Sequence, residues 1–68
     1  MNKNMRQLRL DRGHTQQSLA EKVGVAKPTI HLIEVGKYNP SLKVMKKICN
    51  ELNATLEHLF GDESYIED

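Results

Sequence analysis

The sequence contains only one cysteine, no long apolar run and no apolar stretch near its start. A single thiol, Cys49, cannot form an internal disulfide, and this cysteine usage is typical of a reducing cytoplasm. No run of apolar residues is longer than three, so no membrane-spanning segment is expected. The opening "MNKNMRQLRLD" lacks the apolar region of a signal peptide, so secretion is not expected either.

Basic residues are also absent from the end of the chain. Residues 1–48 contain all ten Lys and Arg against three acidic residues, whereas residues 49–68 contain six acidic residues and no Lys or Arg. This asymmetry favours a basic body that faces a polyanion and an acidic end turned away from it. An unevenly charged, solvated surface is the alternative. The length of 68 residues predicts one domain, over residues 1–61, followed by an acidic tail, 62–68.

Periodicity and punctuation predict five helices and no strand, which is an all-α fold. The expected helices cover roughly residues 2–12, 16–23, 27–35, 42–52 and 56–60. Thr15, Ser41 and Thr55 are good N-caps, and Gly24 and Asn53 suit left-handed C-terminal turns. Connections of three to six residues imply a compact bundle. The apolar face of the fourth helix is predicted to be Leu42, Met45, Ile48, Cys49 and Leu52.

The third predicted helix carries two kinds of side chain on two sides. Ile30 and Ile33 share one side and must face the core. Because each residue turns the helix by about 100°, the side chains that point largely away from the core are those of Lys27, Pro28, His31 and Leu32. Such a mixture is more typical of a contact surface than of a solvated one. For Leu32 alone, an isolated exposed leucine is an equally good reading.

These residues belong to a longer pattern: "TQQSLAEKVGV", then Thr29 and Ile30, then "IE.GK.NPS" from Ile33 to Ser41. The series continues through "SLKVMKKICNEL" and "ATLEHLF", so it covers about residues 4–60. It closely resembles the helix-turn-helix of the lambdoid phage repressor and Cro family, also called Xre-like regulators. The resemblance implies a compact five-helix lambda-repressor-like domain whose helix-turn-helix motif spans about residues 16–35.

The resemblance also implies which residues contact DNA. The third helix would enter the major groove, with Lys27, Pro28 and Leu32 reading bases and Thr29 and His31 as neighbours. Lysine can donate to guanine, and apolar side chains can contact a thymine methyl. The phosphate contacts are expected from Gln16, Gln17, Lys37, Tyr38 and Asn39.

Further implications concern the scaffold. Arg9 and Glu34 match a pair that forms a structural salt bridge in relatives. Three positions depart from the family pattern. His14 replaces a leucine and is expected to be a partly buried packing residue, Val35 replaces a polar residue near the DNA backbone, and Ala26 replaces the usual Ser or Thr cap.

No enzyme, metal site or cofactor is expected. His14, His31 and His58 are too scattered for a zinc site, and Cys49 lacks a partner base. A dimer interface is predicted at the edge that relatives use, comprising Leu56, Leu59, Phe60, Tyr65 and Ile66. The tail that carries the last two residues either frays or packs on the partner subunit.

The sequence therefore predicts a bacterial or phage DNA-binding transcription regulator, acting in the cytoplasm on the nucleoid. A homodimeric repressor on a two-fold-related operator is the leading hypothesis, with double-stranded DNA as partner. The alternative is an antitoxin or bridging module that uses the same fold on a protein; a toxin or antirepressor partner stays open.

Overall fold

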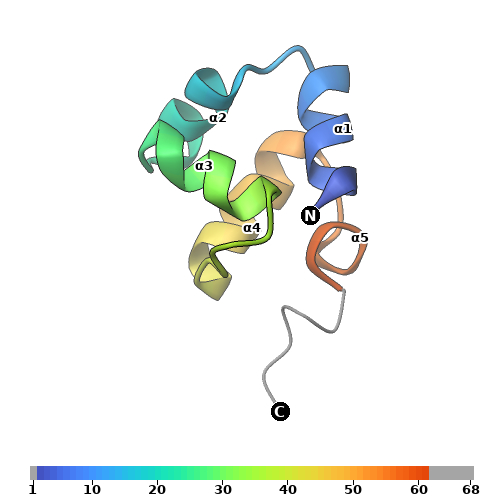
Figure 1. Cartoon of the computed structure of the whole chain (residues 1–68). Helices are drawn as coiled ribbons and strands as arrows, with labels where there is room; N and C mark the ends of the chain where they lie inside the picture. Colours follow the sequence, from blue (N-terminus) through green and yellow to red (C-terminus); the bar gives the residue numbers. More distant parts are fainter. Residues whose placement is uncertain (1, 62–68) are drawn as a thin grey trace.

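The structure, a computed structural model, describes residues 2–61. In that range the chain forms five α-helices and no strand: α1 (Lys3–Asp11), α2 (Gln16–Val23), α3 (Lys27–Glu34), α4 (Leu42–Leu52) and α5 (Leu56–Phe60). The all-α, five-helix prediction is confirmed. Figure 1 shows α1 and α5 on one side and α2 and α3 on the other, and α4 packs on both α2 and α5. The expected tail, with Tyr65 and Ile66, lies outside the described residues.

The helix ends follow the predicted capping chemistry. The hydroxyl groups of Thr15, Ser41 and Thr55 each accept a hydrogen bond from the backbone N–H three residues later, at 2.9, 3.2 and 3.0 Å. Gly24 and Asn53 end α2 and α4 with φ of 85° and 52°. This left-handed conformation is open to glycine and tolerated by asparagine, so both positions stop their helices. Among helices of residues 2–61, none has the length and apolarity to traverse a bilayer.

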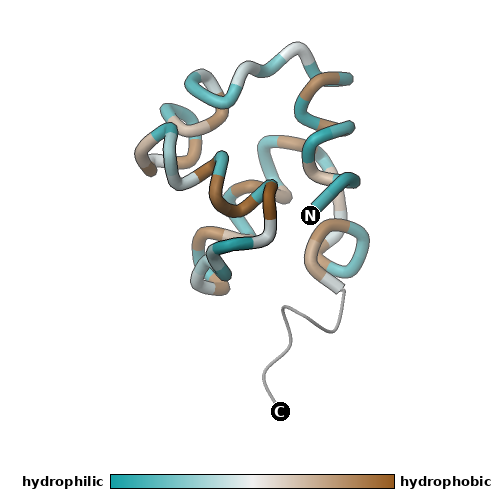
Figure 2. The backbone as a smooth tube through the Cα atoms, in the orientation of Figure 1, coloured by the Kyte–Doolittle hydropathy of each residue, from teal (hydrophilic) through white to brown (hydrophobic). Residues whose placement is uncertain are grey.

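One apolar core joins all five helices. Figure 2 shows that hydrophobic and hydrophilic residues alternate along the backbone of the bundle. The buried members are Met5, Leu19, Ala20, Val23, Ile30, Ile33, Met45, Ile48, Cys49, Leu52, Leu59 and Phe60. The predicted apolar face of α4 is buried except at Leu42, whose side chain is 54% exposed. Leu42 lies in the first turn of α4, where the neighbouring helices do not cover it. Cys49, on the same side of the helix two turns later, is buried.

A buried asparagine ties the start of the chain to two distant helix ends. The Asn2 Oδ1 accepts from the Met5 N–H at 3.0 Å and so caps α1, while its Nδ2 donates to the Leu59 carbonyl at 2.7 Å. The backbone N–H of Asn2 donates to the Glu34 carbonyl at 2.7 Å. Asn2 therefore links α1, the last residue of α3 and α5 through three hydrogen bonds.

The missing cap of α3 predicts a gain in stability. Ala26 occupies the N-cap of α3 with extended backbone angles like those of Thr15 and Ser41, but its methyl group accepts no hydrogen bond. The Thr29 N–H donates to the Ala26 carbonyl at 3.0 Å, and a hydroxyl at position 26 would offer it a second acceptor, so the Ala26→Ser variant should raise the free energy of unfolding by up to about 1 kcal/mol. Urea unfolding followed by circular dichroism measures the change.

The reverse change provides the control for this prediction. Ser41→Ala removes an existing cap at an exposed helix start and should lower the free energy of unfolding by a similar amount, about 1 kcal/mol. A loss in Ser41→Ala without any gain in Ala26→Ser would contradict the prediction.

Candidate nucleic-acid interface

Helices α2 and α3 are joined by a tight turn. The Gly24 and Val25 N–H groups both donate to the Ala20 carbonyl, at 2.8 and 3.0 Å, which closes the end of α2. Only three residues, 24–26, separate α2 from Lys27 at the start of α3. Pro28 lies in the first turn of α3, where no helical partner for its missing N–H exists. The two helices are therefore held at a fixed angle in a helix-turn-helix arrangement (Figure 1).

Helix α3 presents two distinct sides. Ile30 and Ile33 are fully buried in the core. The side chains exposed on the outer side are those of Lys27, Pro28, His31 and Leu32, and Leu32 is 40% exposed. Thr29, the fifth residue predicted to lie at the base contacts, is half-buried. The structure thus brings four of the five together on one accessible surface.

The residues predicted to contact phosphates flank this surface on two elements. Gln16 and Gln17 form the first turn of α2, and the second of them donates to Glu21 at 3.0 Å. Lys37, Tyr38 and Asn39 lie in the loop between α3 and α4 and are exposed. This loop leaves α3 through a hydrogen bond of 2.9 Å from the Lys37 N–H to the Leu32 carbonyl.

A buried ion pair fixes α3 against α1. The Arg9 Nε donates to the Glu34 Oε2 at 2.6 Å and its Nη2 to the Oε1 at 3.3 Å. Their side chains are only 8% and 4% exposed. The Arg9 Nη1 also donates to the His14 carbonyl at 2.9 Å. Arg9 thereby joins α1, the loop before α2 and the end of α3, and the predicted structural pair is present.

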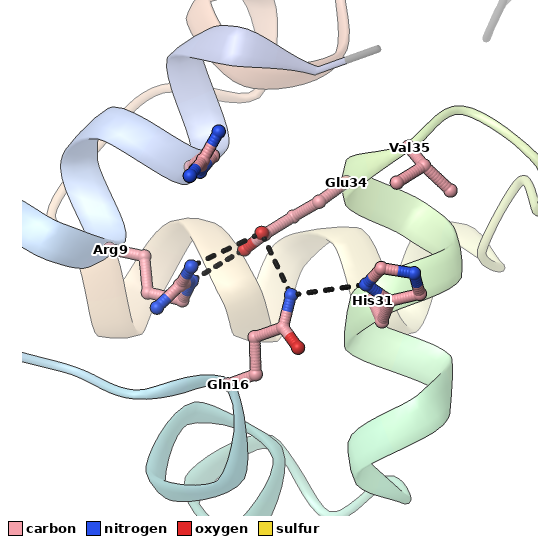
Figure 3. Close-up of a pocket in the computed structure, with 6 residues that line it drawn as sticks. Arg9, Gln16, His31, Glu34 and Val35 are labelled. Atoms are coloured by element: carbon pink, nitrogen blue, oxygen red, sulfur yellow. Dashed lines mark hydrogen bonds and ion pairs between the residues drawn. The ribbon is translucent and has the colours of Figure 1, made fainter.

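Gln16 extends this pair to the exposed side of α3, a link that the sequence did not indicate. Its Nε2 donates to the Glu34 Oε1 at 3.2 Å and lies 3.5 Å from the His31 Nδ1. Figure 3 shows Arg9, Glu34, Gln16 and His31 joined in one chain of contacts. They line a hollow of about 280 Å³ together with Arg6 and Val35. Gln16 therefore has partners within the protein before any ligand is present.

The departures from the family pattern are all visible. His14 is half-buried, as predicted, with its Nδ1 3.0 Å from the Ser18 hydroxyl. Val35 is half-buried and lines the hollow.

At the predicted dimer edge, Leu59 and Phe60 are each only 3% exposed because they belong to the monomer core, whereas Leu56 is 37% exposed. Among the described members of that edge, Leu56 alone has substantial area available to a partner.

Cys49 is a core residue. Burial raises the pKa of its thiol, because desolvation disfavours the thiolate, so little nucleophile is present at neutral pH. Within residues 2–61, no three His, Cys, Asp or Glu side chains gather closely enough to hold a metal ion.

Comparison with known proteins identifies the scaffold. A family model described as helix-turn-helix matches residues 5–59. This range contains α2, α3 and α4 and most of α1 and α5. The chain belongs to the Xre-type helix-turn-helix family. This family is a class of DNA-binding regulators and not of enzymes.

Three relatives illustrate the range of the family. An uncharacterized HTH-type transcriptional regulator from Archaeoglobus fulgidus is 48% identical over 60 residues, which cover 88% of this chain and 86% of that protein. YgzD of Bacillus subtilis, with the same description, is 38% identical over 88% of this chain and 91% of its own. The immunity repressor protein of Bacillus phage phi105 is 31% identical over 90% of this chain and 42% of its own.

The ion pair predicts large losses of stability. Arg9→Ala or Glu34→Ala alone should lower the free energy of unfolding by about 3–5 kcal/mol, because each leaves the other charge buried without a partner. Urea unfolding measures this loss of stability. A variant that is already unfolded in buffer without urea would also agree with the prediction.

An exposed contact on α1 serves as the control. Gln7 donates to Asp11 at 2.9 Å on the helix surface, so Gln7→Ala should change stability by less than about 0.5 kcal/mol. If the Arg9 and Glu34 variants lost under about 1 kcal/mol, the pair would behave like a surface salt bridge and the prediction would be wrong.

Proposed function

We propose that this protein is a sequence-specific regulator of transcription that inserts α3 into the major groove of double-stranded DNA. The observation that carries the proposal is that α3 has one buried apolar side and one exposed side. Ile30 and Ile33 anchor it in the core, while Lys27 and Leu32 stand on its exposed side. An α-helix fits the major groove, and the N-terminal residues of a recognition helix contact base edges.

Different residues serve recognition and affinity in this proposal. Lys27 can donate to guanine O6 or N7, and Pro28 and Leu32 can contact a thymine methyl group. Lys37, Tyr38 and Asn39, on the exposed loop, and Gln16 and Gln17, at the start of α2, would contact phosphates. Phosphate contacts fix the register of the protein on the duplex and add affinity for any sequence.

We further propose a homodimer that acts as a repressor on a two-fold-related operator, bound at the nucleoid in the cytoplasm. Each α3 would occupy one half-site, with the half-sites about 34 Å apart. The exposed Leu56 on α5 supports a self-contact at this edge. The relation to a phage immunity repressor supports the repressor role.

An antitoxin or bridging module is the second candidate. Two exposed leucines that lie outside α3 favour it: Leu10 on α1 and Leu42 on α4 are 52% and 54% exposed. Such side chains suit a protein partner, for example a toxin or an antirepressor. Retention of a single protein partner at high salt, without affinity for duplex DNA, would distinguish this candidate from the regulator.

Selection of bound duplexes from a random pool tests the proposed function. Recovery of an inverted repeat, with half-sites separated by about one helical turn, is the expected result. A recovered site without symmetry would contradict the homodimer. Failure to retain any duplex at low salt would overturn the DNA-binding proposal.

Two lysine variants separate base reading from phosphate binding. Lys27→Ala should lose discrimination at one or two base pairs of the selected site by about 1–3 kcal/mol. Lys37→Ala should weaken binding to all duplexes alike and reduce the slope of log K against log salt by about 0.9. Fluorescence anisotropy with matched and mismatched duplexes, over a salt series, measures both effects.

Each variant is the control for the other, since both remove one exposed positive charge. Equal losses of specificity in the two variants would contradict the separate roles of α3 and the loop after it.

A further inference from the structure

We propose that the outer face of α1 is a docking surface for an acidic segment of the same chain, residues 62–66. This face is formed by Lys3, Arg6, Gln7 and Leu10, which together line a hollow of about 390 Å³. Their spacing of three, four and seven residues places them on one side of the helix. The segment reads DESYI and directly follows the residues that the structure describes. The inference is independent of DNA binding, because it concerns a contact of the chain with itself.

The outer face of α1 combines positive charge with an exposed apolar side chain. Within residues 2–61, no carboxylate forms an ion pair with Lys3 or Arg6. Leu10 is 52% exposed, whereas Met5 on the opposite side of α1 is fully buried. An isolated exposed leucine or a pair of solvated cations is ordinary by itself. A ligand that uses all three side chains at once carries acidic groups and an apolar group.

The acidic segment carries these groups in the matching order. Along α1 the two cations come first, and Leu10 follows about one turn after the second of them. Along the segment Asp62 and Glu63 come first, and the apolar Tyr65 and Ile66 follow. A segment that runs in the same direction as α1 therefore places its acids beside the cations and its apolar side chains on Leu10.

The last described residue lies near the end of α1 at which the acids are required. The Asn4 Nδ2 donates to the His58 carbonyl at 3.1 Å, and the Asn2 Nδ2 donates to the Leu59 carbonyl at 2.7 Å. Figure 1 shows α5 next to the start of α1. Gly61 is only two residues beyond Leu59. The chain therefore continues from the first turn of α1.

The lengths also agree. Lys3 and Leu10 are separated by about 10 Å along the helix axis. The positions 62 and 66 are up to about 13 Å apart when the chain is extended. The segment is thus long enough to follow the outer face from one end to the other. Because it is joined to α5, its binding is intramolecular and needs only weak contacts.

The two ends of α1 favour the same direction of binding. The first turn contains no acidic side chain, and the N-terminal end of a helix stabilises nearby carboxylates. At the other end Asp11 follows Leu10 and accepts a hydrogen bond from Gln7 at 2.9 Å. Its negative charge repels further acids, so the docked part of the chain ends before Glu67.

The test of the charged half uses nitrogen–proton correlation spectra of the full chain. Lys3→Glu combined with Arg6→Glu reverses the charge of the outer face of α1. Lys43→Glu combined with Lys46→Glu makes the same change at exposed positions of α4 and is the matched control. The amide signals of residues 62–66 should move toward those of an unstructured peptide in the α1 variant and keep their wild-type positions in the α4 variant. Equal responses of these signals to the two variants would overturn the inference.

Exchanging the charges provides the rescue. Adding Asp62→Lys and Glu63→Lys to the α1 variant restores opposite charges across the contact. The amide signals of Tyr65 and Ile66 should then return to their wild-type positions. Signals that stay at the positions of an unstructured peptide would contradict the proposed pairing.

The apolar half is tested from the side of the segment. Tyr65→Ser combined with Ile66→Ser keeps every charge, and it should move the amide signals of Gln7 and Leu10 while the signals of α4 stay in place. Signals of α1 that ignore this variant would overturn the inference.

A last measurement identifies the molecule to which the segment belongs. Nuclear Overhauser contacts between the Tyr65 ring and the Leu10 methyl groups are expected within one chain. In an equal mixture of isotope-labelled and unlabelled protein, these contacts should not join a labelled to an unlabelled chain, and they should persist on about tenfold dilution. Contacts that join two chains would assign the outer face of α1 to a subunit interface and overturn the proposal.

Discussion

The buried pair of Arg9 and Glu34 is the interaction on which the rest of the structure depends. Two charges inside a domain of this size cost much desolvation, which is repaid only when their hydrogen bonds are well satisfied. Here the Glu34 carboxylate accepts hydrogen bonds from Arg9 and Gln16, and the Arg9 guanidinium also donates to the His14 carbonyl. Among residues 2–61, no buried side-chain nitrogen or oxygen lacks a hydrogen-bond partner. The pair therefore sets the position of α3 relative to both α1 and α2.

Helix α3 combines good packing with features that do not favour stability. Its inner side is fully buried at Ile30 and Ile33, while its outer side exposes Leu32, and Ala26 leaves its start without a side-chain cap. These outer residues are better explained by a ligand than by folding. Local departures from stabilising patterns are expected where a protein contacts its ligand. The scaffold thus carries the stability, and in the proposed function the exposed side of α3 carries the recognition.

Local signals in the sequence were sufficient for the helices and insufficient for the long-range hydrogen bonds. Thr15, Ser41, Thr55, Gly24 and Asn53 mark helix ends because their chemistry acts within three or four residues. Periodicity also separates the two sides of α3. It does not show that Leu42 is exposed, because a helical pattern does not reveal where the neighbouring helices stop. The link between Gln16 and His31 joins residues 15 apart in the chain, and no spacing rule predicts it.

The three hydrogen bonds of Asn2 have a consequence for the geometry of any dimer. They connect α5, whose Leu56 is the exposed residue at the proposed self-contact, to the end of α3. A rigid connection of this kind lets the two subunits carry their recognition helices at one mutual angle. Inserting a single base pair between half-sites rotates one of them by roughly 35° about the duplex axis. A dimer with this rigid connection would not twist to follow that rotation. Its affinity would therefore depend on the spacing of the half-sites as strictly as on their base sequence.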